Sequence, residues 1–469
     1  TRYWPAPYPA IQQPGLVSPY TVPLELPYLL YQVNDAFDAS AAWTPGSPPQ
    51  HYLIMTARER AELADIGDST DGEEDTNAQM NGTFISVDGT GIELRYNVGI
   101  RNRGHGSRSG PPNNYHLEIP SDASWHGVNA YNLNCRTTYA QIVGSAIYRM
   151  AGLAAAEAAS VKLFVNGTDM AAYSNMYGVY VGLEAFNSQF AANHFPLDPN
   201  GNLYSAFRSD ANLYNDADFR YEGTDPAAYQ DVYFKESNQE VNDWSDLIHM
   251  TEVLASTPDE TYVQRVGQVI NIDQFLRYLA VDTLIMNRET TLNTGWGDDY
   301  FLYRGVEDPR FILIPHDLDT ILGEGGSAGS INQNVFAVVD GLADRGNSPG
   351  IDGLKTLFQQ PEVIQRYYQM LRELATTVFS SAAFDPLVDQ AIGAFAAPEA
   401  AQIKAYAANR AAAVLAQIPD EFTITSPLPI TSGYPYTTVD STTLSGTSDA
   451  ARTASVLVNG QPAAWNART

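Results

Sequence analysis

The sequence predicts an α+β protein with a β-rich region first, a mixed and largely helical region next, and a short all-β segment last. Segments rich in β-branched and aromatic residues, separated by turn pairs, fill residues 28 to about 120. Apolar residues at helical spacing recur in the segments that follow. After Pro419 the chain becomes rich in Thr, Ser, Gly and β-branched residues. A chain of 469 residues is also long enough for two or three domains.

We expect three parts along the chain. Residues 1–27 indicate an extended arm rich in Pro and Tyr, because a segment such as YWPAPYPAIQQPG favours extended backbone over a packed core. Residues 28–420 form the main body, β-rich to about 120 and mixed or helical after it. Residues 421–469 indicate strands of an immunoglobulin-like β-sandwich. A complete sandwich takes about 100 residues, so only part of one is expected.

Strands are predicted at both ends of the main body. HYLIMT and GIELRYNVGIRNRG form the β-rich part, with turns expected at Asn81-Gly82 and Asp88-Gly89. VKLFVNGTDM and MYGVYVGLE follow as two further strands, the second ending at Glu184. Later in the chain, DYFLYR and RFILIP predict a hairpin with GVEDP as its connection.

Helices are predicted where apolar residues repeat every 3.6 positions. One such segment spans about 136–156. Another helix begins at Asn271, where Gln274 follows three residues later as in a capping box. Two more helices are expected over about 361–379 and 398–417.

The charge balance is strongly acidic. Lys and Arg number 26 against 54 Asp and Glu, so the formal net charge is −28. Such a surface repels the phosphates of nucleic acids, and no nucleic-acid partner is expected. It also attracts divalent cations. From Asp68 to Asp75 five of eight residues are carboxylates, which indicates a solvated loop or, as the alternative, a loop that binds Ca²⁺.

We expect a secreted or cell-surface protein, because the first residue is Thr1 rather than Met, as after removal of a leader. The single cysteine, Cys135, permits no internal disulfide, so cysteine pairing neither supports nor opposes export. The most apolar stretch, about 150–165, carries Glu157 and Lys162, so no membrane span is expected.

Four short motifs occur in a fixed order: VGIRNRGHGSR (98–108), VNG followed by YGVYVGLE (165–184), GNLY (201–204), and DDYFLYR leading to IPHDLDTILG (298–323). As an ordered set they resemble the CotH (spore-coat protein H) family of kinase-like proteins. The resemblance implies an atypical protein-kinase-like core of CotH type. It also implies ATP with Mg²⁺ or Mn²⁺ as cofactors, and transfer of phosphate to an exported or surface protein.

The resemblance also implies the metal half of a site. The first Asp of the family's Trp-Asp-x-Asp turn corresponds to Asp317 of His-Asp-Leu-Asp, with Asp319 beside it, and the family's metal-binding Asn corresponds to Asp299. Glu289 falls near the position of the catalytic Asp. Asp317 and Asp319 stand two residues apart at a strand end, so both point to one face if the strand continues. The alternative is that these two carboxylates only cap the following turn.

The phosphate half of the site departs from the family pattern. Asn113 and Asn114 stand where family members usually carry a lysine, and an amide brings no charge to oppose phosphate. Arginines can replace that lysine because a guanidinium grips phosphate with two donors. The candidate cofactor-binding residues are therefore Arg101, Arg103, Lys235 and Glu184.

Three functions remain open on this basis. The first is metal- and ATP-dependent phosphotransfer. The second is a catalytically degenerate subunit of an extracellular coat, appendage or filament, joined to copies of itself by strand exchange; the missing lysine, the N-terminal arm and the partial tail motivate it. The third, a carbohydrate- or surface-binding module, rests on the 11% aromatic content and the sandwich-like tail.

Overall fold

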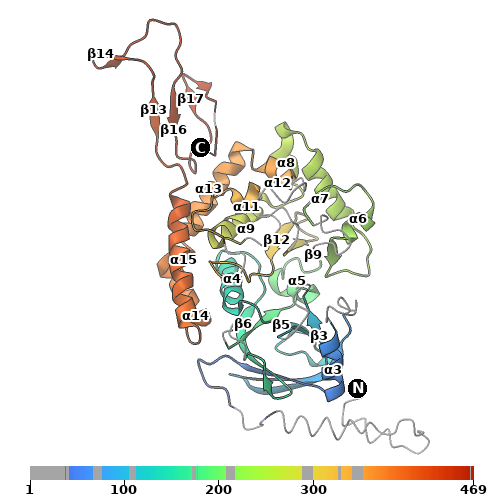
Figure 1. Ribbon diagram of the computed structural model, residues 1–469. Coiled ribbons are helices and arrows are strands. Elements are labelled where there is room, and N and C mark those ends of the chain that lie inside the picture. The colour runs from blue at the N-terminus through green and yellow to red at the C-terminus, as the bar shows by residue number, and fades with distance from the viewer. Residues whose placement is uncertain are drawn as a thin grey trace, which may run out of the picture. The chain divides into compact units, whose positions relative to one another are not determined.

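A computed structural model of the chain describes residues 37, 42–66, 77–104, 112–171, 176, 178–207, 217–287, 299–325, 329–340, 352–464 and 466–468 (Figure 1). The chain divides into two compact units. The first unit comprises residues 1–146, 155–196 and 386–402, and the second comprises 147–154, 197–385 and 403–469. Residues 28–420, expected as one body, thus contribute to both units, and the arm predicted over 1–27 lies outside the described residues.

The first unit is built around an eight-stranded sheet of strand order β1-β2-β3-β4-β5-β8-β6-β7. β1 also pairs with β6 in parallel, so the sheet closes on itself. The inward side chains, among them Phe84, Ile100, Leu117 and Leu133, form one buried cluster. The elements are β1 (Gln50–Ile54), α3 (Ala57–Asp65), β2 (Met80–Asp88), β3 (Gly91–Arg103), β4 (Asn114–Glu118), β5 (Ala130–Asn134), α4 (Thr138–Met150), β6 (Ala158–Val165), β7 (Thr168–Asp169), β8 (Tyr180–Glu184) and α5 (Ser188–His194).

The turn expected at Asn81-Gly82 is wrong, because both residues lie inside strand β2. Gly82 is required there by packing. A Cβ at this position would lie 2.5 Å from Cδ1 of Ile100 and 3.0 Å from the carbonyl oxygen of Ile54. The turn expected at Asp88-Gly89 is confirmed: Asp88 pairs with Gly91 where β2 turns into β3.

The imidazole of His51, in β1, is buried among the rings of Phe84, Trp125 and Tyr131, whose centroids lie 5.2, 5.3 and 5.6 Å away. Burial lowers the pKa of His51 from 6.5 to about 3. Below pH 6.5 the unfolded chain therefore takes up a proton that the folded chain does not. Folding stability should fall as the pH drops from 6.5 towards 3, by about 1.4 kcal/mol per pH unit.

His51→Phe should remove this contribution, which is measured as the slope of the unfolding free energy against pH in urea titrations. The slope of the variant between pH 6.5 and about 4 should be smaller than that of the wild type by about one proton. His249→Phe is the matched control, because that imidazole is 62% exposed. Equal slopes for His51→Phe and the wild type would contradict the assignment.

The second unit combines a four-stranded sheet of order β10-β9-β11-β12 with helices, among which α9 packs against α11 and α13 (Figure 1). The hairpin β11–β12 and the helices predicted near 271, 361 and 398 are confirmed. The elements are β9 (Asn202–Ala206), α6 (Pro226–Gln230), β10 (Tyr233–Lys235), α7 (Ser245–Ser256), α8 (Tyr262–Val266), α9 (Ile272–Ile285), β11 (Tyr300–Arg304), β12 (Ile312–Pro315), α11 (Ala337–Asp340), α12 (Asp352–Leu357), α13 (Pro361–Thr376), α14 (Ser381–Ile392) and α15 (Ala397–Leu415), with α14 and α15 continuing into the first unit.

The start of α9 fixes this helix to the hairpin. Asn271 Oδ1 accepts a hydrogen bond from Gln274 N at 3.2 Å, which is the expected cap. The side chain of Gln274 does not complete a capping box. Instead its Nε2 donates to the carbonyl oxygen of Leu313, at 2.6 Å, and its Oε1 accepts from Leu313 N, at 2.9 Å. Strand β12 is thereby held at a fixed register beside α9.

The C-terminal segment forms three separate two-stranded sheets. Their strands are β13 (Thr423–Thr425), β14 (Ile430–Thr431), β15 (Tyr434–Pro435), β16 (Ser445–Thr447), β17 (Leu457–Val458) and β18 (Gln461–Pro462). Ladders this short do not make the immunoglobulin-like sandwich, which stays a prediction. Within the part of the chain that the structure describes, no helix has both the length and the apolar character needed to cross a bilayer.

Candidate functional site

The first unit carries two rows of polar side chains on one face of its sheet. Arg101 pairs with His116, which pairs with Asn132; Arg103 pairs with Asn114 two residues further along. Directly paired residues share a face, and so do residues two apart on a strand. The residues between them point into the core instead. The strand alternation therefore brings the two predicted arginines to the same face.

The two arginines have different partners. Arg103 Nη1 donates to Asn134 Oδ1 at the end of β5, and Asn134 Nδ2 donates to Gln141 Oε1 of α4 at 2.9 Å. Arg101 Nη1 instead donates to Asn77 Oδ1 at 3.3 Å and to the carbonyl oxygen of Asn102 at 3.4 Å. Arg103 is thus connected to β5 and to α4. Sequence reasoning missed Asn134 and Gln141, because neither is charged.

Asn113 and Asn114, at the family's lysine position, are mostly buried. Asn114 Oδ1 accepts a hydrogen bond from Cys135 N at 2.8 Å, and the carbonyl oxygen of Asn113 accepts one from Tyr180 Oη at 3.2 Å. Both residues therefore tie β4 to neighbouring elements of the first unit.

Glu184, a predicted cofactor contact, is a buried acceptor at the end of β8. Its carboxylate accepts hydrogen bonds from His194 Nε2 (2.7 Å), Asn193 Nδ2 (2.9 Å) and Glu157 N (3.3 Å). Burial alone would raise the pKa of Glu184, but the hydrogen bonds from His194 and Asn193 outweigh it and lower the pKa. These hydrogen bonds hold α5 against the sheet. A cofactor that contacts Glu184 would have to compete with these donors for its carboxylate.

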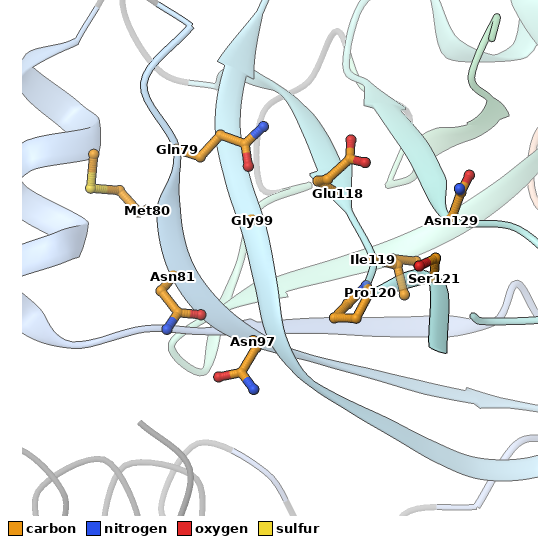
Figure 2. Close-up of a pocket in the computed structure, with 10 residues that line it drawn as sticks. All are labelled: Gln79, Met80, Asn81, Asn97, Gly99, Glu118, Ile119, Pro120, Ser121 and Asn129. Carbon is orange, nitrogen blue, oxygen red and sulfur yellow. The ribbon is translucent and has the colours of Figure 1, made fainter. Parts of the chain in front are cut away.

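A pocket of about 420 Å³ opens on the same sheet at Gly99, which pairs with Asn81 on one side and Glu118 on the other. Figure 2 shows Gln79 and Glu118 flanking Gly99, with further amides around the opening. Among the described residues that line it there is no lysine or arginine, and Arg101 and Arg103 lie outside its lining.

In the second unit, the predicted residues Asp299 and Asp317 lie with His316 at one end of hairpin β11–β12. The ladder ends with the pair Tyr300 and Pro315, so Asp299 and His316 lie opposite each other just beyond it. His316 Nδ1 is 3.7 Å from Asp299 Oδ1, and Asp317 follows at once. Asp299 and Asp317 both have positive φ angles, 62° and 43°, so the backbone turns sharply at both strand ends.

The turn after Asp317 is fastened to the end of α9. Leu322 N donates to the carbonyl oxygen of Ile285, the last residue of α9, at 2.8 Å. The turn then needs glycine: Gly325 has a φ of +77°, and a Cβ there would lie 2.5 Å from the carbonyl oxygen of Asp319. The acidic turn is therefore held beside the helix whose end leads to Glu289. Glu289 itself lies outside the described residues.

A buried carboxylate supports the same helix end. Asp282 is fully buried in α9 and accepts a hydrogen bond from Tyr148 Oη. Burial raises the pKa of Tyr148 well above its usual value, and the nearby Asp282 raises it further. The carbonyl oxygen of Asp282 also accepts Asn287 N at 3.0 Å. In the sequence, Asp282 could have been recognised only as a carboxylate in a part of the helix whose other residues are buried, Tyr278 to Ile285.

Lys235, the other predicted phosphate contact, has a structural position. Its side chain is buried, and Nζ donates to the carbonyl oxygens of Val241 (3.1 Å) and Asp243 (2.9 Å). The ammonium group also lies 5.6 Å from the centroid of the Tyr204 ring. These contacts fix the turn before α7 and leave the ammonium directed at backbone.

Lys235→Met should therefore lower stability by about 1–3 kcal/mol, because a buried ammonium group loses its two hydrogen bonds to backbone carbonyls. It should leave the affinity for ATP within about twofold of the wild type, since no charge is removed from a phosphate site. Urea titration and calorimetry measure the two quantities. Lys162→Met, at an exposed position of β6, is the control for loss of a charge. If Lys235→Met were as stable as the wild type but no longer bound ATP, Lys235 would have to be a phosphate contact after all.

The donor chemistry of the hairpin end fits a magnesium ion. Mg²⁺ takes one or two carboxylates and completes its shell with phosphates and water, and Asp299 and Asp317 supply two carboxylates. Among the residues that the structure describes, no group of three or more His, Cys, Asp or Glu side chains is placed to hold one metal ion. The acidic run 68–75 predicted as a loop falls on residues outside that description.

Comparisons with known proteins give a family match and two distant structural neighbours. The CotH family, described as CotH kinase protein, matches residues 100–412. The crystal structure of a proinflammatory kinase of Helicobacter pylori, CtkA, is 12% identical with a TM-score of 0.31, and the alignment covers 64% of this chain and 91% of that one.

A toxin–antitoxin complex of Shewanella oneidensis (HipA, HipB and operator DNA) is 10% identical with a TM-score of 0.29, covering 80% of this chain and 73% of that one. No curated protein matches. The family match spans well over half of the sequence, and the chain belongs to the CotH kinase family.

Proposed function

We propose that this chain is an exported kinase that uses ATP and Mg²⁺ or Mn²⁺ to phosphorylate exported or surface proteins. The observation that carries the proposal is the end of hairpin β11–β12, where Asp299 lies opposite His316 and Asp317 follows, and where the turn after Asp317 is bonded to the end of α9. Membership of the CotH kinase family supports it. Export and the identity of the acceptor are parts of the proposal, motivated by the sequence alone.

Phosphoryl transfer requires the protein mainly to position groups and to neutralise charge. Bound ATP with its metal ion would supply the phosphoryl group and most of the neutralising charge. Asp317 and Asp299 would hold the metal, with Asp319 beside them in the turn. Glu289 would orient the acceptor hydroxyl and accept its proton. Because Glu is one methylene longer than Asp, its carboxylate has to be placed differently from the catalytic Asp of the family.

Arg103 is our candidate for the cation that faces phosphate. In protein kinases the strand after the phosphate-covering hairpin carries a lysine that pairs with a glutamate of the next helix. Here the hairpin β3–β4 is followed by β5 and α4, and the pair is Asn134 with Gln141, which has no charge. Arg103 binds Asn134 and so brings a guanidinium to this neutral pair.

The test is transfer of labelled γ-phosphate from ATP to a mixture of exported proteins in the presence of Mg²⁺. Asp317→Asn should reduce the labelling at least about 100-fold, because a lost metal contact removes several kcal/mol of charge stabilisation. Asp308→Asn is the matched control: this carboxylate lies in the connection between β11 and β12, at the other end of the hairpin from Asp317, exposed and bonded to Arg310. Equal labelling by wild type and Asp317→Asn would refute the assignment.

The structural-subunit function is favoured by one specific observation. The C-terminal sheets leave large apolar side chains exposed, among them Phe422 at 70% and Tyr434 at 75%. Pairing of β13–β16 with another copy would cover such side chains. Light scattering at increasing concentration tests this function. A strictly monomeric chain, with and without Ca²⁺, would count against it.

A further inference from the structure

A second pocket, of about 270 Å³, lies within the second unit between α7, the turn after α8 and the connection of hairpin β11–β12. One part of its wall is apolar and includes Val253, Val269, Pro309 and Phe311. The size is just below that of pockets for drug-sized ligands. The pocket therefore suits a small ligand that has an apolar part.

The polar part of the wall is cationic. Arg265 and Arg304 line the pocket from different elements, together with the amide of Gln268. The side chain of Arg265 makes no hydrogen bond or ion pair within the described residues, and it is exposed. Convergent guanidinium groups bind phosphate and carboxylate with paired donors. Two arginines in one pocket also stand out in a chain whose formal net charge is −28.

The acid in the pocket is already engaged. Asp246 accepts hydrogen bonds from Asn202 Nδ2 (2.8 Å), Tyr204 Oη (2.7 Å) and Leu247 N (2.7 Å). Its Oδ2 lies 4.0 Å from Nη1 of Arg304, beyond hydrogen-bond distance. Asp246 thus attracts the Arg304 guanidinium without accepting a hydrogen bond from it, which leaves guanidinium donors for a ligand. His249 also lines the pocket and lies 3.8 Å from Glu252.

We propose that this pocket binds a small organic anion, a phosphomonoester or carboxylate carried on an apolar group. Arg265 and Arg304 would bind the anionic group, and Phe311 with the neighbouring apolar wall would bind the remainder. This site is separate from the proposed metal site, since Arg304 ends β11 while Asp299 precedes its first residue. The same chemistry is found in a free metabolite and in an acidic or phosphorylated side chain of a peptide.

Calorimetry with phenyl phosphate, inorganic phosphate and benzyl alcohol tests the site in the full-length chain without added metal. Phenyl phosphate should bind more tightly than inorganic phosphate, and benzyl alcohol should not bind measurably. Arg265→Gln and Arg304→Gln should each weaken phenyl phosphate at least about tenfold, as expected for loss of a charge-assisted contact. Arg452→Gln is the control, because that side chain is 82% exposed and lies outside the pocket.

Arg265 is exposed and makes no hydrogen bond or ion pair with any residue that the structure describes, so Arg265→Gln should fold normally. It therefore still tests the proposal if Arg304→Gln does not fold. Binding that is unchanged in Arg265→Gln, or no binding of phenyl phosphate by the wild type, overturns the proposal. Asp317→Asn should bind phenyl phosphate like the wild type, which separates this site from phosphotransfer. A phosphotyrosine peptide that binds at least as tightly as phenyl phosphate would identify a peptide side chain as the source, whereas a weaker peptide would identify a free small molecule.

Discussion

Arg410→Met should destabilise the second unit by about 3 kcal/mol or more, the largest stability effect that we expect for one substitution outside the apolar core. Arg410 of α15 is fully buried and makes no ion pair within the described residues. Its Nε donates to the carbonyl oxygen of Thr283 at 3.0 Å, and its Nη1 donates to those of Ile331 and Gln333 at 2.6 Å each. Methionine fills the space but leaves the carbonyl of buried Thr283 and those of half-buried Ile331 and Gln333 without this donor.

The measurement is urea unfolding of Arg410→Met against the wild type. Arg366→Met is the matched control, because Arg366 on α13 pairs with Asp273, whose side chain is 63% exposed, and is itself 32% exposed. That variant should change stability by less than about 1 kcal/mol. An Arg410→Met protein as stable as the wild type would show that the three carbonyls do not depend on the guanidinium.

Arg103→Gln should weaken the binding of ATP with Mg²⁺ by about 10- to 100-fold, the largest effect on nucleotide affinity that we expect in the first unit. The loss of charge-assisted hydrogen bonds to phosphate costs about 1.5–3 kcal/mol, which corresponds to this range. Arg103 is singled out because it is bonded to Asn134, which is bonded to Gln141, whereas Arg101 is bonded to Asn77.

Two further variants make this test specific. Arg101→Gln should change the affinity by less than about threefold, although it removes the same charge from the same face of the sheet. Arg103→Lys should recover part of the affinity, since an ammonium keeps the charge but not the planar fork of donors. Equal losses in Arg101→Gln and Arg103→Gln would mean that charge on this face matters and the link to Asn134 does not.

Much of the fold could be predicted because the local pattern and the final packing agree. Helices α4, α9, α13 and α15 and the hairpin β11–β12 follow from periodicity and turn residues alone. Helix α3 could also have been predicted, because Thr56 and Glu59 form a capping box at the start of ARERAELAD. Helix α7 carries a weaker signal, because its N-cap is Trp244, whose side chain makes no cap hydrogen bond.

The remaining features depend on contacts between distant segments. The closure of the first sheet rests on the parallel pairing of β1 with β6, more than a hundred residues apart, and no local pattern encodes that pairing. Gly82 looked like a turn residue because its partners, Ile54 and Ile100, are visible only in the folded sheet. Long-range packing decided these positions, and sequence propensity did not.

The candidate site likewise contains residues that could be predicted from the sequence and residues that could not. Asp299 and Asp317 were found through a motif whose strand ends meet by hairpin geometry, and the structure places both at that end. Lys235 was chosen for its charge, and its burial against two backbone carbonyls depends on the turn at 241–243. Asn134 and Gln141 carry no charge. Their role could be recognised only in the structure, where β5 meets α4.

We expect this chain to bind a nucleotide through the acidic turn of the second unit. Calorimetric titration of ATP with Mg²⁺ into the wild type and into Asp317→Ala is the decisive test. The wild type should bind ATP only in the presence of Mg²⁺, and Asp317→Ala should not bind it, while the variant unfolds at the same urea concentration as the wild type. No binding by a correctly folded wild type, or equal binding by both proteins, would contradict it.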